Sequence, residues 1–290
     1  MHSSLVYMLI SALGFALMAA CVKAVSAYAI PLLEIVAARA AISLLISYLD
    51  VKRKGISVWG NERGLLFARG LVGSLALVCV YYAVSTLPLA EASVLQFTYP
   101  AFTALLALIF LREAIQLRTL LCLGFSFFGL LVMLQPQWQE SGLGGGMDAL
   151  PLFSLVAALA GAFGSAVAYV LVRRLSQTED SSVIIFYFPL VALPGSLLFL
   201  GQDFVMPSLP ALLLLLGVGV FTQIGQVGLT KAMALEGAAK VSAYAYVQVV
   251  FAALLGWFFF QEIPSLWTLL GGVLILFGAL ANSWPQRRNC

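Results

Sequence analysis

The chain consists of two similar apolar halves, and each half has enough apolar sequence to cross a membrane five times. An offset of 149 residues (262 minus 113) sets Glu262 on Glu113 and aligns the segments around both glutamates. Apolar matches count for little in such a chain, but polar matches such as Ser93 with Ser242 indicate a duplication. Because five crossings is an odd number, the second half is expected to be inverted relative to the first, as in alternating-access carriers.

The composition excludes a water-soluble domain. Of the 290 residues, 62% are hydrophobic and only 9% are charged, and the mean hydropathy is +1.05. A soluble protein needs more charged surface than this to cover its core. The net charge of +3 is spread over the connections between apolar segments, so it is a sign of membrane topology and not of a nucleic-acid-binding surface.

About 20 apolar residues cross the roughly 30 Å of hydrocarbon in a bilayer. Segment length and the absence of a two-residue alternation favour helices over barrel strands. The sequence therefore predicts an all-α polytopic membrane protein with ten transmembrane helices, at 5–26, 30–49, 65–87, 89–111, 116–134, 149–172, 182–200, 208–234, 238–260 and 266–284. The predicted organisation is a first five-helix repeat (1–134), an external linker (135–148) and a second, inverted five-helix repeat (149–290).

Lysine and arginine positions predict the orientation, because cytoplasmic loops retain positive charge. With the N-terminus inside, thirteen basic residues lie at or near the cytoplasmic face: Lys52, Arg53, Lys54, Arg63, Arg69, Arg112, Arg118, Arg173, Arg174, Lys231, Lys240, Arg287 and Arg288. Only Lys23 lies toward the other face, and Arg39 is in mid-span. We therefore expect a multi-pass protein of the cytoplasmic (inner) membrane with both termini in the cytoplasm.

No metal, cofactor or catalytic site is predicted. The four cysteines have no close spacing and are interpreted as packing residues. The single histidine, His2, is terminal, and no P-loop, HExxH or GxSxG sequence occurs. We expect a protein that is not an enzyme, is a monomer or weak homodimer, and has the lipid bilayer and a small molecule as partners.

Segment 87–134 resembles the signature of EamA-type members of the drug/metabolite transporter superfamily, with small residues and Pro100 in the fourth span, Glu113 at its end and a glycine-containing fifth span. Segment 235–280 repeats this pattern. The resemblance implies ten helices in inverted repeats, cytoplasmic termini and a central cavity formed chiefly by helices 1, 3, 4, 6, 8 and 9. The second half has Val249 in place of the proline, so the ninth span need not share a kink. The first span lacks the glutamate of the small multidrug relatives, which argues against proton-coupled drug export.

Polar side chains inside the spans are the candidates for a substrate cavity, because such groups are costly in hydrocarbon unless they face protein or water. Pro100 in the fourth span has no N–H, so the Gln96 carbonyl lacks its usual helical donor. The proline is explained either by a structural kink or by a ligand contact at this carbonyl. Gln226 is interpreted as a contact between helices more than as a cavity residue. The predicted substrate-binding residues are Arg39, Gln96, Tyr99, Gln223, Tyr244 and Gln248.

Arg39 is the most informative single residue. An arginine cannot lose its charge, so it needs an anion from either the protein or a substrate. Glu34 is five residues away, roughly 140° around the helix, which is a poor pairing geometry. A structural partner elsewhere is the competing interpretation. Arg69 is expected to be an anchor at the cytoplasmic interface, and the repeat offset aligns Arg39 with Phe188.

Three further charges, Glu34, Glu91 and Lys240, are candidates for gating or coupling, although Glu91 and Lys240 could equally lie in the head-group region. The balance of charges in the spans is positive. The sequence therefore predicts a secondary transporter, an exchanger or facilitator, for an anionic or zwitterionic metabolite such as an amino acid, an organic acid or an amino-acid-derived nucleoside conjugate. The alternatives are a lipid-intermediate flippase or a multidrug/cation exporter of the same fold, and a non-transporting membrane sensor or scaffold.

Overall fold

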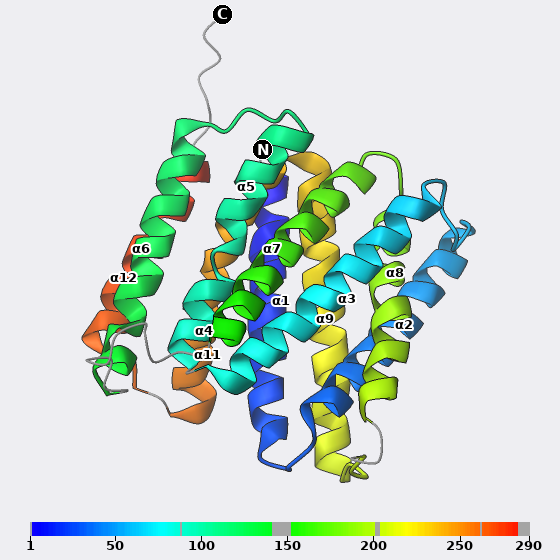
Figure 1. Ribbon diagram of the computed structural model, residues 1–290, viewed down its shortest axis with the longest axis horizontal. Coiled ribbons are helices and arrows are strands. Elements are labelled where there is room, and N and C mark those ends of the chain that lie inside the picture. Colours follow the sequence, from blue (N-terminus) through cyan, green and yellow to red (C-terminus); the bar gives the residue numbers. More distant parts are fainter. Residues whose placement is uncertain (1, 88, 141–151, 201–203, 262, 284–290) are drawn as a thin grey trace, which may run out of the picture.

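The computed structural model describes residues 2–87, 89–140, 152–200, 204–261 and 263–283, and in these ranges all regular structure is helical (Figure 1). The helices are α1 (His2–Ser26), α2 (Leu32–Lys54), α3 (Arg63–Thr86), α4 (Leu89–Gln96), α5 (Tyr99–Phe110), α6 (Leu117–Glu140), α7 (Leu152–Leu175), α8 (Ser181–Leu200), α9 (Leu209–Leu235), α10 (Ala238–Ala243), the 3₁₀ turn η2 (Tyr244–Tyr246), α11 (Val247–Phe260) and α12 (Leu266–Ser283). The predicted all-α class is confirmed.

The helices have the length and apolar composition of membrane spans. Within the described ranges nine segments of at least 18 residues qualify, with α4–α5 and α10–α11 each counted as one span, and the apolar helix Leu266–Asn282 is slightly shorter. Helix α6 continues to Glu140, so residues 135–140 of the predicted linker are helical, and its remaining residues lie outside the described part of the chain. The protein is thus a multi-pass membrane protein.

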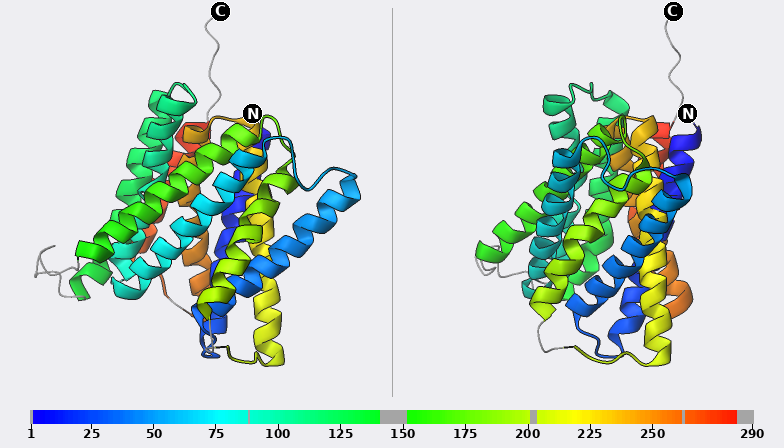
Figure 2. Two further views of the ribbon diagram at one scale, coloured as in Figure 1. Left: turned by 45° about the vertical axis from the view of Figure 1, so that its right-hand side comes forward. Right: turned by 90° about the vertical axis from the view of Figure 1, so that its right-hand side faces the viewer.

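Successive spans run in alternating directions through one bundle (Figure 1). Helix α1 begins and helix α12 ends at the same end of the bundle, as two further views confirm (Figure 2). We call this end the terminal end and the opposite end the distal end. Helices α2 and α7 finish at the terminal end and carry basic residues in their last turns, which are Lys52, Arg53, Lys54, Arg173 and Arg174.

The packing of helices in one half is matched by packing in the other. Helix α1 lies along α9 and α3 along α7, while α2 packs on α8 and α6 on α12. In the last pair a Cβ atom on Gly271 would meet the Gly129 carbonyl oxygen, and one on Gly278 would lie 3.1 Å from the Cys122 carbonyl oxygen. The offset of 149 exchanges these two contacts. Two inverted repeats would produce this reciprocity, although the division into repeats remains a prediction.

Both central spans are interrupted at corresponding positions. Helix α4 ends at Gln96 and α5 begins at Tyr99, and the Thr98 carbonyl accepts the first hydrogen bonds of α5. Pro100 has no N–H with which to continue the ladder of α4. The ninth span is broken by η2 although it has no proline there. The Tyr246 hydroxyl donates to the Phe97 carbonyl at 2.7 Å, and the two rings stack with centroids 5.7 Å apart. The irregularity in one span is therefore joined to the irregularity in the other.

Polar contacts join helices of the two halves at the terminal end. Arg173 Nε lies 2.6 Å from Glu113 Oε1, and the Ala238 N–H donates to the other carboxylate oxygen at 2.7 Å. Arg173 Nη1 also donates to the Met233 carbonyl at 2.5 Å. Glu113 therefore connects the end of the fourth span with α7 and with the start of α10. Its predicted counterpart, Glu262, lies outside the described residues.

The contact between α6 and α12 predicts different effects for two adjacent glycines. A Gly271→Ala change places a methyl group against the backbone of α6 and should lower the free energy of unfolding by about 1–3 kcal/mol. A Gly272→Ala change meets no atom within 4 Å and serves as the control, with unchanged or slightly raised stability. Thermal unfolding in detergent measures both, and equal midpoints for the two variants would contradict the packing described here.

Candidate functional site

A cavity of about 450 Å³ lies between the helices of the two halves, in the middle and distal part of the bundle. The predicted helices 1, 3, 4, 6, 8 and 9 all contribute to it, as α1, α3, α4–α5, α7, α9 and α11. Helices α2 and α8 contribute as well, through Arg39 and Phe188 among others. Its walls are mainly apolar and aromatic, and no Asp or Glu is among the described residues that line it.

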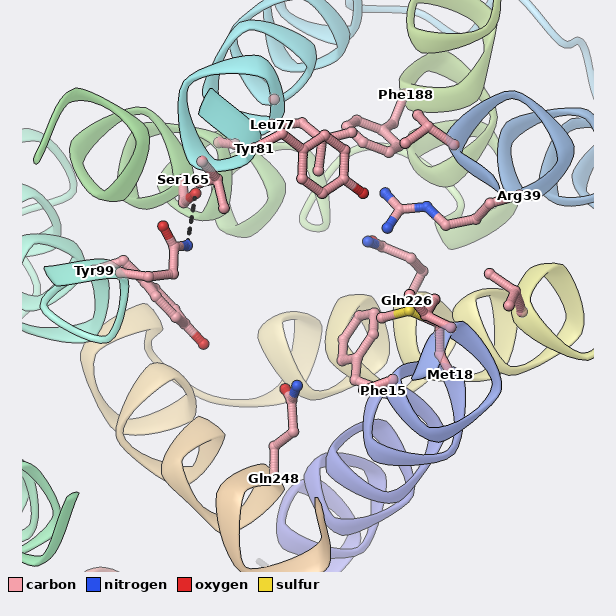
Figure 3. Close-up of a pocket in the computed structure, with 18 of the residues that line it drawn as sticks. Phe15, Met18, Arg39, Leu77, Tyr81, Tyr99, Ser165, Phe188, Gln226 and Gln248 are labelled. Atoms are coloured by element: carbon pink, nitrogen blue, oxygen red, sulfur yellow. Dashed lines mark hydrogen bonds between the residues drawn. The ribbon is translucent and has the colours of Figure 1, made fainter. Parts of the chain in front are cut away.

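Two arginines share one aromatic ring in this cavity. The guanidinium carbon of Arg39 lies 5.6 Å from the ring centroid of Phe188, and that of Arg69 lies 4.9 Å from the same centroid. Figure 3 shows Arg39 extending from α2 into the cavity beside Phe188 and toward Gln226. The ring attracts both cations through its negative face, but it cannot neutralise them.

Arg69 is almost completely buried, with 3% of its surface exposed. Its Nη2 donates to Gln226 Oε1 at 3.2 Å, whereas Nε and Nη1 are buried without a hydrogen-bond partner. Neither Arg69 nor Arg39 forms an ion pair with a carboxylate in the described part of the chain. A buried guanidinium group without an anion costs stability. The described residues therefore leave the positive charge at this end of the cavity without a counter-ion.

Another part of the cavity wall carries uncharged polar and aromatic groups. Gln96 Nε2 donates to Ser165 Oγ at 3.5 Å, while Gln96 Oε1 is buried without a partner. The rings of Tyr99 and Tyr169 meet edge to face at 5.1 Å. Gln248, from α11, also points into the cavity (Figure 3). The cavity thus has one cationic region and one region of uncharged hydrogen-bonding groups.

Four of the six predicted binding residues line this cavity, namely Arg39, Gln96, Tyr99 and Gln248. Gln223 does not, because its amide accepts from Ser43 at 2.5 Å and donates to Ser47 at 2.8 Å, joining α9 to α2. Tyr244 is buried in the core with 2% exposed. The structure places neither residue in the lining of this cavity, because depth in the membrane does not reveal which side of a helix faces the cavity.

Several residues of the site were missed or misinterpreted. Arg69 was expected at the interface, yet it lines the cavity because α3 crosses the bundle obliquely (Figure 1). Gln226 was interpreted as a helix contact, and it both lines the cavity and supports that arginine. Tyr169 was not considered at all. An arginine four residues into the predicted span 65–87 was the one available signal for this region.

Of the three predicted gating or coupling charges, the two whose side chains are described, Glu34 and Lys240, have separate partners. Glu34 is 4% exposed and accepts the backbone N–H of Val205 at 3.0 Å, so it does not pair with Arg39. Lys240 pairs with Glu236, four residues before it, at 3.2 Å. The side chain of Glu91 lies outside the described residues. Neither Glu34 nor Lys240 lines the large cavity.

Comparison with known proteins gives a consistent family. The profile of the EamA-like transporter family matches residues 2–135 and 152–284. The pseudopaline exporter CntI of Pseudomonas aeruginosa is 34% identical over 288 residues, which cover 99% of this chain and 98% of the exporter. Solute carrier family 35 member G1 of Mus musculus is 30% identical over 97% of this chain and 79% of its own length.

More distant matches extend over most of the chain as well. An S-adenosylmethionine uptake transporter of Rickettsia felis is 27% identical over 220 residues, which cover 76% of this chain and 71% of that protein. A solved structure described only as a crystal structure of a protein superimposes with a TM-score of 0.82 at 18% identity, over 97% of this chain and 96% of its own. This likeness concerns the fold alone.

The two glutamines predicted to bind substrate should respond differently to substitution. Gln223→Leu leaves the hydroxyl groups of Ser43 and Ser47 buried without this partner and should destabilise the protein by about 1–3 kcal/mol. Gln248→Leu removes an amide that faces the cavity and should leave the unfolding midpoint unchanged. Thermal unfolding of the two variants in the same detergent compares their stabilities. An equal loss of stability would argue against a structural role for Gln223 and a cavity position for Gln248.

Proposed function

We propose that this chain, which belongs to the EamA-like transporter family, is a secondary transporter of an anionic or zwitterionic metabolite. Relatives are named as transporters or exporters of small metabolites, and the chain is a small-metabolite transporter by that membership. The family and these relatives are named for transport and not for a chemical reaction. The proposal concerns the charge of the substrate and the way in which it crosses the membrane.

One observation carries the proposed substrate charge. The cavity contains Arg39 and Arg69, and the described residues that line it include no carboxylate. The unpaired Nε and Nη1 of Arg69 are two charged donors on different edges of the guanidinium group, and each could donate to a carboxylate oxygen. A lipophilic cation would be repelled by both arginines and would leave their charge uncompensated. The cavity thus favours a carboxylate-bearing metabolite over a cationic drug.

The proposed mechanism is alternating access by two inverted five-helix repeats. Basic residues at the terminal end support a cytoplasmic location for that end and for both termini. The membrane in this proposal is the cytoplasmic (inner) membrane. The cavity lies in the middle and distal part of the bundle, and the contacts of Glu113 with Arg173 and Ala238 close the other end. Without a carboxylate in the described cavity wall to carry a proton, exchange or facilitated diffusion is the proposed mode.

Replacing the buried arginine should separate ligand binding from folding. Arg69→Gln removes an uncompensated charge, so the unliganded protein should be at least as stable as the wild type. It should also lose the rise in unfolding temperature that a carboxylate-bearing ligand causes in the wild type, since a ligand stabilises only the form that it binds. A thermal-shift screen against a library of organic acids and amino acids measures both effects.

The control is Arg174→Gln, at an exposed arginine of the terminal end. This variant should keep the rise in unfolding temperature that a carboxylate-bearing ligand causes in the wild type. Loss of folded protein in Arg69→Gln would favour a structural role for this arginine. Unchanged ligand shifts in a well-folded Arg69→Gln protein would contradict the proposed anion site.

The terminal-end contacts predict how the cavity opens. Glu113→Gln weakens the contacts with Arg173 and the Ala238 N–H, so the terminal end should open more often. Ala12 lies in α1 and is 2% exposed. In a background without native cysteines, labelling of an Ala12→Cys variant by a water-soluble maleimide should therefore become severalfold faster. Glu236→Gln, which breaks only the local pair with Lys240, is the matched control. Equal labelling rates in all three backgrounds would show that Glu113 does not restrain this end.

A further inference from the structure

The side-chain amide of Gln226 has only one orientation that suits its neighbour. Arg69 Nη2 lies 3.2 Å from Gln226 Oε1, and a guanidinium group can only donate hydrogen bonds. The amide atom on this side must therefore be the oxygen. The amide nitrogen, Nε2, carries two N–H groups and lies on the other side of the amide. Arg69, from α3, thus fixes the orientation of a side chain that comes from α9.

This nitrogen is accessible from the cavity. Gln226 lines the cavity and is partly exposed, whereas Arg69 is 3% exposed. Within the described part of the chain, Gln226 Nε2 has no hydrogen-bond partner, and unlike Nε and Nη1 of Arg69 it is not enclosed by surrounding atoms. Figure 3 shows the Gln226 side chain at the open space of the cavity. A ligand in the cavity can therefore reach the two N–H groups of this amide.

Arg39 adds further donors to the same side of the cavity. It is partly exposed, and its side chain forms no hydrogen bond with the described residues. Figure 3 shows the side chains of Arg39, from α2, and Gln226, from α9, extending toward each other. Neither nitrogen group can accept from the other, because both present only N–H donors. Together they offer a ligand donors and positive charge, which suits an oxygen atom that carries lone pairs and no proton.

The charge of Arg69 acts on the cavity through the Gln226 amide. Nε and Nη1 of Arg69 are enclosed, and its Nη2 is engaged by Gln226 Oε1. A hydrogen bond from a charged donor polarises the group that accepts it, and the effect is larger where water is excluded. The N–H groups of Gln226 therefore become stronger donors toward the cavity.

We propose that Gln226 is a specificity-determining residue, which donates through Nε2 to an ionised oxygen of the substrate, and that Arg69 is the positioning residue that holds the amide in this orientation. This inference rests on the proposed function, because the oxygen belongs to the carboxylate proposed there. The site selects ionised acids against the primary amides of the same acids. An amide has no charge for the arginines, and its own N–H groups would face the donors of Arg39 and Gln226.

The test compares acids with amides of the same carbon skeleton, and it measures the concentration dependence of the thermal shift of the purified full-length protein. The pairs are 3-phenylpropionate with 3-phenylpropanamide, hexanoate with hexanamide, and glutarate with glutaramide. For each pair, the ratio is the concentration of the amide divided by the concentration of the acid that gives the same shift. We expect a ratio of at least about ten for the best-binding acid of the wild type.

Gln226→Met tests the amide donors directly. It removes both N–H groups, adds no charge and leaves both arginines in place, so attraction by the arginines alone would keep the wild-type ratio. We expect the ratio to fall about tenfold, because a hydrogen bond to a charged oxygen is lost. Gln177→Met, at an exposed glutamine outside the cavity, is the matched control and should keep the wild-type ratio. A lower unfolding midpoint without ligand, together with an unchanged ratio, would show a purely structural role and overturn the inference.

Gln226→Glu separates the donor role from the support of Arg69, and it keeps the inference testable if Gln226→Met does not fold. The glutamate retains an oxygen for Arg69 Nη2 and supplies the buried charge with an anion, so the unliganded protein should unfold at a higher temperature. It offers no N–H group to a ligand, and the acids should no longer raise the unfolding temperature. A more stable Gln226→Glu protein that keeps the wild-type ratio would contradict the inference.

The compounds and variants together separate this inference from the proposed function. A preference for the acids that persists unchanged in both Gln226 variants would overturn the role of Gln226 and leave the carboxylate site standing. Equal binding of the acids and their amides by the wild type would show that the negative charge is not needed, and the proposed function would fail. The absence of a shift with every compound would overturn both.

Discussion

The unpaired charge of two arginines inside the membrane-spanning bundle is the constraint on which the account depends. Arg69 is 3% exposed and, like Arg39, stands against Phe188 without a carboxylate in the described part of the protein. A guanidinium group does not lose its proton, so the cost of burying it persists until an anion arrives. The described residues that line the cavity carry no other charge, so the carboxylate binding proposed above would relieve this cost.

The rest of the bundle holds this cavity between two halves that pack along four helix pairs and are also joined by specific polar and aromatic contacts. Tyr246 bonds to the Phe97 carbonyl and stacks on its ring, and these two residues correspond under the repeat offset. The interruptions of both central spans therefore meet and support each other. Glu113 and Arg173 join the halves again at the terminal end. A carrier needs such discrete contacts, because each can be made in one state and broken in another.

The sequence predicted the helical class, the approximate spans and much of the cavity, because hydropathy and charge are properties of segments. It could not predict which side of a helix faces inward. Gln223 and Gln226 are three residues apart on α9, yet the first bonds to Ser43 and the second lies in the cavity. The same limit explains Arg69, whose depth depends on the oblique course of α3. The break at η2 was also unforeseen, since no proline marks it in the sequence, and it coincides with the contact between Tyr246 and Phe97.

Uptake into sealed vesicles that contain the purified protein tests the central claim most directly. The account predicts saturable uptake of a radiolabelled carboxylate-bearing metabolite, with competition by other carboxylates and none by a lipophilic cation such as tetraphenylphosphonium. Saturable uptake of the lipophilic cation, with no uptake of any carboxylate, would contradict it.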